Sequence, residues 1–318
     1  MGYEARIVCH SSAQGVPSLM TAVVKYPRIV IAEVVTHRTV CGDPAVCERS
    51  TPDDISKNSA SSRAISFSRM VRDVMDDPYI PDRFTKNGSG MQGHGHLDGA
   101  DHERARSAWL RARDYAVEQA WEMYHAGVHK QDVNRLLEPW AWVTQILTAD
   151  DWGWNNFFAL RCHAAAHPAF QRVARMLYLE YRKSVPEFIA FGQWHLPLVT
   201  PEQKQDFVWV PSGATITPTL IPDQVQFSAA RCAWVSYVNH DKDGTPEKMR
   251  STFEKLMCHV PIHASPVEHQ ATPMHPDLKY PDHTRSNLRG WIQARKLIAR
   301  ERIDHYEPSD AEVQSWGL

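Results

Sequence analysis

The sequence lacks the residue patterns of several protein classes. It has no Cys-x-x-Cys pair, and its six cysteines show no repeated zinc-binding spacing. It also has no excess of basic residues, with 35 Lys and Arg against 37 Asp and Glu. A dedicated nucleic-acid-binding protein needs a strongly basic face, so we expect no nucleic-acid partner. Because no zinc-binding spacing is present, we also expect no resident metal ion.

Long hydrophobic runs are missing as well. No apolar stretch has the length that a membrane span needs, and the N-terminal residues do not form a signal-like segment. We therefore expect a cytoplasmic protein with reduced cysteines and no membrane partner. The chain has 318 residues without internal repeats or a low-complexity linker, which predicts one α/β domain over residues 1–318.

Hydrophobic periodicity predicts where the main elements lie. Residues 26–35 (YPRIVIAEVV) are apolar and rich in β-branched side chains, which favours a buried strand. Helical spacing predicts helices at about residues 61–74, 101–125, 131–138, 155–183 with a break at Pro168, 246–259 and 287–302. A GxGxxG match at residues 88–93 is interpreted as a loop, because no strand precedes it and further glycines follow.

Four short segments carry residues suited to binding a phosphate and a flat heterocycle. They are His37-Arg38-Thr39 with Ser56-Lys57-Asn58-Ser59-Ala60-Ser61-Ser62-Arg63, then Asn134-Arg135-Leu136-Leu137-Glu138-Pro139, residues 148–161 with Asn156 and Arg161, and His263-Ala264-Ser265-Pro266-Val267-Glu268-His269. Arginine forks bind phosphate through two parallel hydrogen bonds. Taken singly, each segment is equally compatible with a capped helix start, a core helix or a polar turn.

Together these segments resemble the flavin-dependent thymidylate synthases. That family has an Arg-His-Arg strand end, S-x-N-E-x-S-x-R, an Arg four residues before a Pro, and N-F-L-x-L-R. It also has A-R-V-S-[YF] and H-x-[ST]-P-x-E-H, which resemble Trp234-Val235-Ser236-Tyr237 and residues 263–269. In the family the last two motifs come first, whereas here they lie within residues 228–272. The sequence therefore resembles a circularly permuted member, similar to the phage-encoded branch, whose protein would act in the host cytoplasm.

The resemblance implies an α/β fold with a mixed sheet flanked by long helices, and a homotetramer that binds FAD between subunits. It implies one-carbon transfer to C5 of a deoxypyrimidine monophosphate, with methylenetetrahydrofolate as carbon donor and NADPH as a candidate reductant. The implied flavin contacts are His37, Arg38, Asn156, Ser236 and His269. The implied substrate contacts are Glu33, Ser59, Ser61, Arg63, Arg135 and Arg161, of which Ser61, Arg63 and Arg161 are also the expected catalytic residues.

Several positions depart from the family pattern. The first Arg of Arg-His-Arg is Thr36, the acidic residue of the serine-rich motif is Ser59, and Glu33 stands where the family has Gln. Residues 39–56 form an insertion, and Asp150 and Trp152 replace two flavin-contacting residues. The expected reaction is conversion of dUMP to dTMP, while a carboxylate at Glu33 leaves hydroxymethylation of dCMP or dUMP open. Glu33 is equally suited to pair with a nearby arginine.

Three other interpretations remain open at this stage. A metal hydrolase would use His125 and His129 or the histidines near residue 96, although the helical pair lacks a central glutamate. A thymidylate synthase with a cysteine nucleophile would use one of the Cys-His neighbours at 9–10, 162–163 or 258–259, although none follows a proline. A non-catalytic nucleotide-binding relative would explain the changed motif positions.

Overall fold

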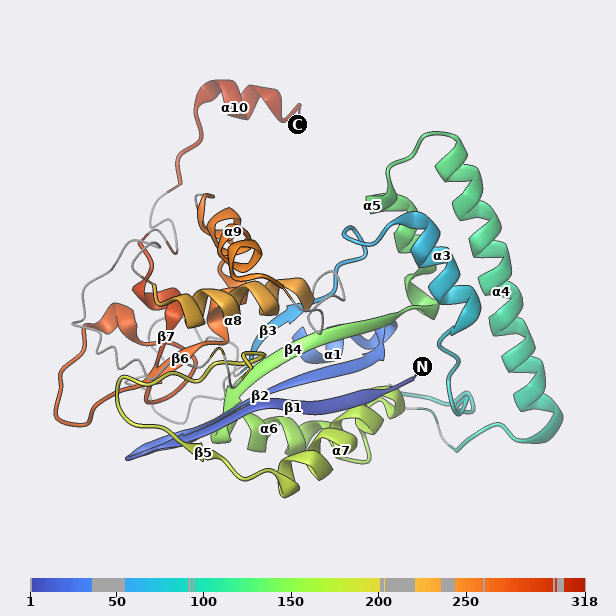
Figure 1. The fold of residues 1–318 in the computed structure, drawn as a ribbon. Coiled ribbons are helices and arrows are strands. Elements are labelled where there is room, and N and C mark those ends of the chain that lie inside the picture. Colours follow the sequence, from blue (N-terminus) through green and yellow to red (C-terminus); the bar gives the residue numbers. More distant parts are fainter. Residues whose placement is uncertain are drawn as a thin grey trace.

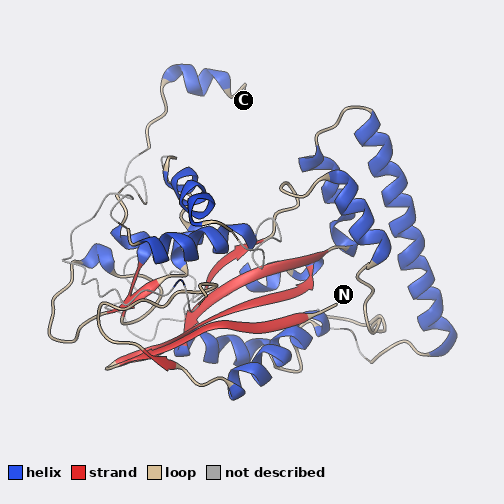
Figure 2. Ribbon diagram, viewed as in Figure 1, coloured by secondary structure: helices blue, strands red, loops and turns tan. Residues whose placement is uncertain are grey.

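The computed structural model describes residues 2–35, 55–90, 93, 95–200, 203, 221–235, 244–259, 261–299, 301 and 306–317. A mixed sheet with the strand order β3-β4-β2-β1-β5 forms its centre (Figures 1 and 2). The strands are β1 (Glu4–Ala13), β2 (Val16–Pro27), β3 (Ser56–Ser59), β4 (Trp142–Asp150) and β5 (Glu187–Phe188). Neighbouring strands are antiparallel except for β1 and β5.

The central hairpin follows from its sequence. β2 is dense in apolar and β-branched residues, and Gly15 turns the chain between β1 and β2 with a φ of 75°. From Leu19 to Pro27, β2 pairs with all of β4, so that Thr21 lies opposite Thr148. Because side chains alternate between the two faces of a strand, one face of β4 carries Val143, Leu147 and Ala149, and the other carries Thr144, Ile146 and Thr148.

Helices cover both faces of the sheet (Figure 1). α6 (Asp151–Arg161) and α7 (Pro168–Lys183) pack on the face of Leu147 and Ala149, where their aromatic residues join the largest apolar cluster. α8 (Asp223–Trp234) packs on the opposite face, where Cys232 contacts the cluster of Val23 and Ile146. We call these the α6 face and the α8 face.

The remaining elements form two flanking groups. α3 (Phe67–Asp76), α4 (Gly99–His125), α5 (Lys130–Val133) and the 3-10 helix η2 (Asn134–Trp140) share their own apolar cluster. Near α8 lie α9 (Pro246–Met257), the 3-10 helix η6 (Ser265–Glu268), the small sheet of β6 (Ala271–Pro273) and β7 (Trp291–Gln293), and the 3-10 helix η8 (Ala294–Leu297). The 3-10 helix η7 (Asp282–Thr284) lies between β6 and β7, and α10 (Asp310–Ser315) follows η8.

The structure confirms the α/β class and corrects several element assignments. The expected strand at 26–35 is wrong beyond Pro27, because the 3-10 helix η1 (Arg28–Val30) and α1 (Ala32–Val35) follow β2. The predicted final helix at 287–302 is wrong as well, since β7 and η8 occupy that range. The break at Pro168 is confirmed, with Pro168 in the first turn of α7 and His167 as its N-cap. The helix predicted from residue 61 begins only at Phe67.

Candidate functional site

Arg161 and Glu33 form an ion pair that joins the end of α6 to α1. The guanidinium is largely enclosed, with 14% of the Arg161 side chain exposed against 35% of the Glu33 side chain. Arg161 also lies 5.7 Å from the ring centroid of Phe170, and Phe170 contacts Tyr26 edge to face. Arg161 is therefore the arginine partner of Glu33, a pairing that the sequence left open.

A hydrogen-bonded series on the same face leads from Tyr26 to Ser59. The Tyr26 hydroxyl donates to Oε1 of Gln145 at 2.6 Å, and Nε2 of Gln145 donates to Oγ of Ser59 at 3.4 Å. Burial raises the pKa of Tyr26 well above its ordinary value, so the phenol keeps its proton and acts as the donor. Ser59, Glu33 and Arg161 thus lie around one aromatic layer on the α6 face.

The other substrate-binding predictions fall on two segments that are tied together. Nδ2 of Asn134 donates to the carbonyl oxygens of Ser62 and Ile65, at 2.8 Å and 3.1 Å. Oγ of Ser62 donates to Glu138 at 2.6 Å, and Arg135 lies 3.8 Å from the same carboxylate. These bonds hold the loop that carries Ser61 and Arg63 against the η2 turn that carries Arg135. Arg63 is exposed, and so is most of the Arg135 side chain.

The short segment η1–α1 connects both groups of substrate-binding predictions. Arg28 in η1 donates to the carbonyl oxygen of Ala60 at 2.9 Å and pairs with Glu138 at 3.0 Å. Five residues along the chain, Glu33 in α1 pairs with Arg161. The segment η1–α1 therefore contacts Arg161 on one side, and on the other side Ala60 and Glu138, which lie beside the predicted residues Ser61 and Arg135.

The C-terminal motifs contact the other end of β3. On the α8 face, Nδ2 of Asn58 donates to the carbonyl oxygen of Cys232 at 2.8 Å. Nε2 of Gln293 donates to Oγ of Ser56 at 2.9 Å and to the carbonyl oxygen of Glu268 at 2.9 Å. Segments separated by more than 170 positions are thus brought together at β3.

Glu268, the carboxylate of the H-x-S-P-x-E-H segment, belongs to a network of ion pairs. Glu268 pairs with Arg295, and Arg295 pairs with Glu301 at 2.7 Å. Burial raises the pKa of Glu268, while the adjacent guanidinium opposes that shift. Glu268 therefore anchors the segment to η8, and this anchoring fixes the position of the neighbouring His269.

His269 is fully buried and is linked to a chain of polar side chains that the sequence did not reveal. Its Nδ1 lies 2.8 Å from Oγ1 of Thr148, and Oγ1 of Thr148 lies 2.6 Å from Oγ1 of Thr21. Oγ1 of Thr21 lies 2.8 Å from Nε2 of His195, whose Nδ1 lies 2.8 Å from Oγ of Ser11. Each of these five side chains is at most 2% exposed.

The free end of this chain is Nε2 of His269, which has no hydrogen-bond partner among the described residues. Burial lowers the pKa of His269 from its ordinary 6.5 to about 3, so the ring is neutral at physiological pH. A buried polar atom without a partner is uncommon in folded proteins. A polar ligand atom at Nε2 would satisfy it, which fits a residue expected to contact a flavin.

The remaining flavin-contact predictions are placed only in part. Asn156 lies on α6, and therefore on the face of the sheet opposite to His269. Within a single subunit, Asn156 and His269 therefore lie on opposite faces of the sheet. His37, Arg38 and Ser236 lie outside the described residues, as does most of the 39–56 insertion.

Asp150 has a structural role at the start of α6. Its Oδ1 accepts from the backbone N–H groups of Trp152 and Gly153, which makes it the N-cap of the helix. Arg289 donates to the same carboxylate from its backbone nitrogen at 2.8 Å and from Nη1 at 3.0 Å. This buried carboxylate is therefore occupied by protein donors.

Among the described residues, nothing favours the metal hydrolase or the thymidylate synthase with a cysteine nucleophile. They contain no group of three or more His, Cys, Asp or Glu side chains that would hold a metal ion. Of the Cys-His neighbours, Cys9 is half-buried, Cys258 is exposed, and burial raises the pKa of Cys162, which disfavours its thiolate. No helix in the described part of the chain has the length and hydrophobicity to cross a membrane.

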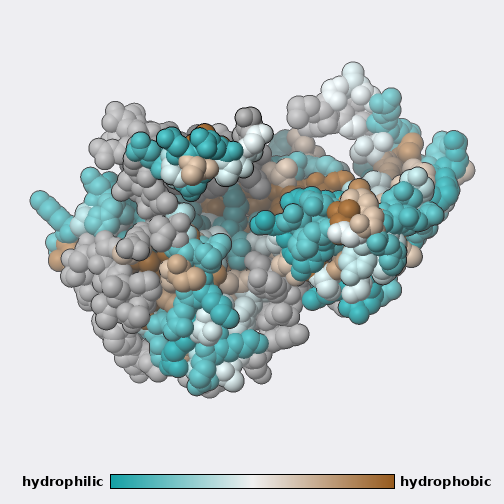
Figure 3. All heavy atoms as spheres, turned by 90° about the horizontal axis from the view of Figure 1, so that it is seen from above, coloured by the Kyte–Doolittle hydropathy of each residue, from teal (hydrophilic) through white to brown (hydrophobic). Residues whose placement is uncertain are grey.

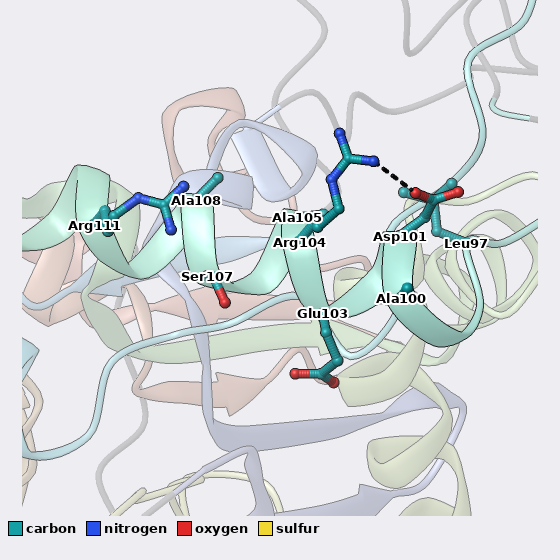
Figure 4. A pocket seen from close by; sticks show the side chains of 9 residues that line it. All are labelled: Leu97, Ala100, Asp101, Glu103, Arg104, Ala105, Ser107, Ala108 and Arg111. Atoms are coloured by element: carbon teal, nitrogen blue, oxygen red, sulfur yellow. Dashed lines mark hydrogen bonds and ion pairs between the residues drawn. The ribbon is translucent and has the colours of Figure 1, made fainter.

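A surface pocket lies elsewhere, along the first turns of α4 (Figure 4). Its lining includes Asp101, Arg104 and Arg111, and Asp101 pairs with Arg104 at 3.1 Å. None of the predicted site residues lines it. Seen from above, hydrophobic residues are visible near the centre of the molecule, with hydrophilic residues on either side (Figure 3).

Comparisons with known proteins give a partial match at the level of structure. No protein-family model and no curated protein matches the sequence. A crystal structure of the UMP/dUMP methylase PolB from Streptomyces cacaoi, bound with 5-Br UMP, is similar with a TM-score of 0.45 and 15% identity, covering 57% of this chain and 89% of that one. A second PolB structure, bound with 5-Br dUMP, has a TM-score of 0.37 and 17% identity, with coverage of 52% and 66%. At this level the similarity carries no argument about function.

Proposed function

We propose that this protein is a flavin- and folate-dependent enzyme that transfers a one-carbon unit to C5 of a deoxypyrimidine monophosphate, with dUMP as substrate and dTMP as product. The observation that supports the proposal is that β3 is hydrogen-bonded to residues beside or linked to the C-terminal motifs. Asn58 of the serine-rich motif bonds to Cys232, two residues before Trp234, and Gln293 bonds to both Ser56 and Glu268 of the C-terminal motif.

The substrate would bind around η1–α1 on the α6 face. Arg161 is enclosed and oriented by Glu33, while Arg63 and Arg135 come from two segments that Asn134 ties together. Guanidinium groups of this kind bind a phosphate and stabilise negative charge that develops on a pyrimidine carbonyl. Ser61 would orient the substrate, and no protein nucleophile is needed.

The flavin would be held by His37, Arg38, Asn156, Ser236 and His269. Nε2 of His269 supports this proposal, because it is a buried nitrogen that lacks a partner among the described residues. A reduced flavin supplies electrons, and methylenetetrahydrofolate supplies the carbon. Since Asn156 and His269 lie on opposite faces of the sheet, we further propose that two subunits of a homotetramer contribute them to one site.

Hydroxymethylation of dCMP is a second candidate, favoured by the carboxylate of Glu33 within the substrate group. A carboxylate accepts a hydrogen bond from the amino group of cytosine but repels the carbonyl oxygen of uracil. The deciding experiment is incubation with FAD, methylenetetrahydrofolate, NADPH and either dUMP or dCMP, followed by mass spectrometry of the products. We expect dTMP from dUMP. No flavin binding and no product from either nucleotide would refute both candidates and leave a non-catalytic relative.

A further inference from the structure

The buried chain Ser11–His195–Thr21–Thr148–His269 has few possible arrangements of its protons. A threonine hydroxyl has one hydrogen to donate. Within this series of side chains, Thr21 has His195 and Thr148 as partners, and Thr148 has Thr21 and His269. The two threonine hydroxyl oxygens lie 2.6 Å from each other. Exactly one of the two hydroxyl hydrogens must occupy the contact between them, because two hydrogens would clash and none would leave two oxygens in repulsion.

Two head-to-tail orders therefore remain for neutral rings. In the first, Nε2–H of His195 donates to Thr21, Thr21 donates to Thr148, and Thr148 donates to Nδ1 of His269. In the second, every bond is reversed, so that Nδ1–H of His269 donates to Thr148 and Thr21 donates to Nε2 of His195. Both rings carry Nε2–H in the first order, and both carry Nδ1–H in the second.

We propose that Thr21 and Thr148 couple the tautomers of the two imidazoles, so that His195 is a positioning residue that determines whether Nε2 of His269 donates or accepts a hydrogen bond. The inference rests on the distances within the chain and is independent of the proposed enzymatic function. A ligand atom that accepts a hydrogen bond from Nε2 of His269 would select the first order and set both rings to Nε2–H. A ligand donor would select the second order.

The full-length protein with ¹⁵N-labelled histidine tests this coupling by NMR, since protonated and unprotonated ring nitrogens resonate in separate ranges. His269→Leu leaves Thr148 with Thr21 as its acceptor, so Thr21 must donate to His195 and that ring must carry Nδ1–H. His195→Leu leaves Thr21 with Thr148 as its acceptor, so His269 must carry Nε2–H. Because wild-type rings share one tautomer, exactly one of the two substitutions should change the tautomer of the surviving ring.

A second pair of variants gives the same forced outcomes while keeping both rings. Thr148→Val should set His195 to Nδ1–H, and Thr21→Val should set His269 to Nε2–H. Thr148→Ser and Thr21→Ser retain the hydroxyl and should leave the wild-type tautomers unchanged, which separates coupling from a loss of packing. Opposite tautomers in the wild-type protein, a doubly protonated ring, or tautomers that match the serine counterpart in both valine variants would overturn the proposal.

Discussion

Nδ2 of Asn58 donates to the carbonyl oxygen of Cys232 at 2.8 Å, and this bond joins two segments that lie 174 positions apart. β3 is a four-residue strand at the edge of the sheet, so its own ladder with β4 gives it few bonds. The contact to α8 therefore adds to the bonds of Gln293 and Gln145 with Ser56 and Ser59 in fixing β3.

We predict that Asn58→Ala lowers the free energy of unfolding by about 0.5–1.5 kcal/mol, because the substitution removes the side-chain hydrogen bond to the Cys232 carbonyl, which keeps only the backbone N–H of Val235 as a donor. Urea denaturation followed by circular dichroism measures the change. The matched control is Asn87→Ala at an exposed loop position, where we expect less than about 0.5 kcal/mol. Equal stability of the two variants would show that β3 does not depend on this contact.

The sequence predicted the helices better than the strands. The 3.6-residue periodicity of 101–125 and the proline at 168 are local signals, and they locate α4 and the start of α7. β1, β2 and β4 were not assigned, because their burial results from pairing between strands distant in sequence. The β-branched run after Pro27 gave a false strand. The backbone N–H of Arg28 still bonds to the carbonyl oxygen of Ala141 at 2.8 Å, and the chain then turns into η1 and α1.

Candidate residues could be selected from the sequence where a motif is contiguous, whereas their contacts depend on packing and could not. Glu33 and Arg161 were selected as separate candidates, and their ion pair emerges only from the contact between α6 and α1. Thr21 and His195 belong to no motif. They could be recognised only after the strand register placed Thr21 opposite Thr148.

His269 predicts a specific acid sensitivity. Its folded-state pKa of about 3 lies below the ordinary 6.5, so its contribution to stability is complete above pH 6.5 and is lost as the pH falls toward 3. In this range the unfolded chain binds a proton that the folded protein does not. We expect His269→Gln to reduce the slope of the unfolding free energy between pH 6 and pH 4 by about 1.4 kcal/mol per pH unit.

Denaturant titrations at closely spaced pH values measure that slope. His283→Gln is the control, because it makes the same substitution at an exposed histidine of η7. If wild type and His269→Gln lose stability in parallel below pH 6, the buried ring does not titrate as proposed.

Asp150 should be a major stabilising residue. Its carboxylate caps α6 and pairs with Arg289, and it has no exposed surface. We expect Asp150→Ala to destabilise the protein by about 2–4 kcal/mol, because the cap and the charged hydrogen bonds disappear together. Asp150→Asn should cost less, since the amide oxygen still caps the helix.

Thermal and denaturant unfolding of both variants test this expectation, with Asp101→Ala as the control at an exposed ion pair on α4. Exposed pairs contribute about 0–1 kcal/mol, so the control should remain close to wild type. An Asp150→Ala variant as stable as this control would show that the buried pair contributes no net stabilisation.

Arg161 should determine nucleotide affinity without determining the fold. Its guanidinium is largely enclosed beside Glu33, and losing a hydrogen bond to a charged group costs about 1.5–3 kcal/mol. Arg161→Ala should therefore weaken the binding of dUMP by roughly tenfold to hundredfold, as measured by calorimetry.

The matched control is Arg172→Ala on α7, whose ion pair with Asp82 is exposed and lies outside the predicted site. Circular dichroism should show both variants folded. Equal dUMP affinity in the two variants would remove Arg161 from the substrate site, and the ion pair with Glu33 would then be structural.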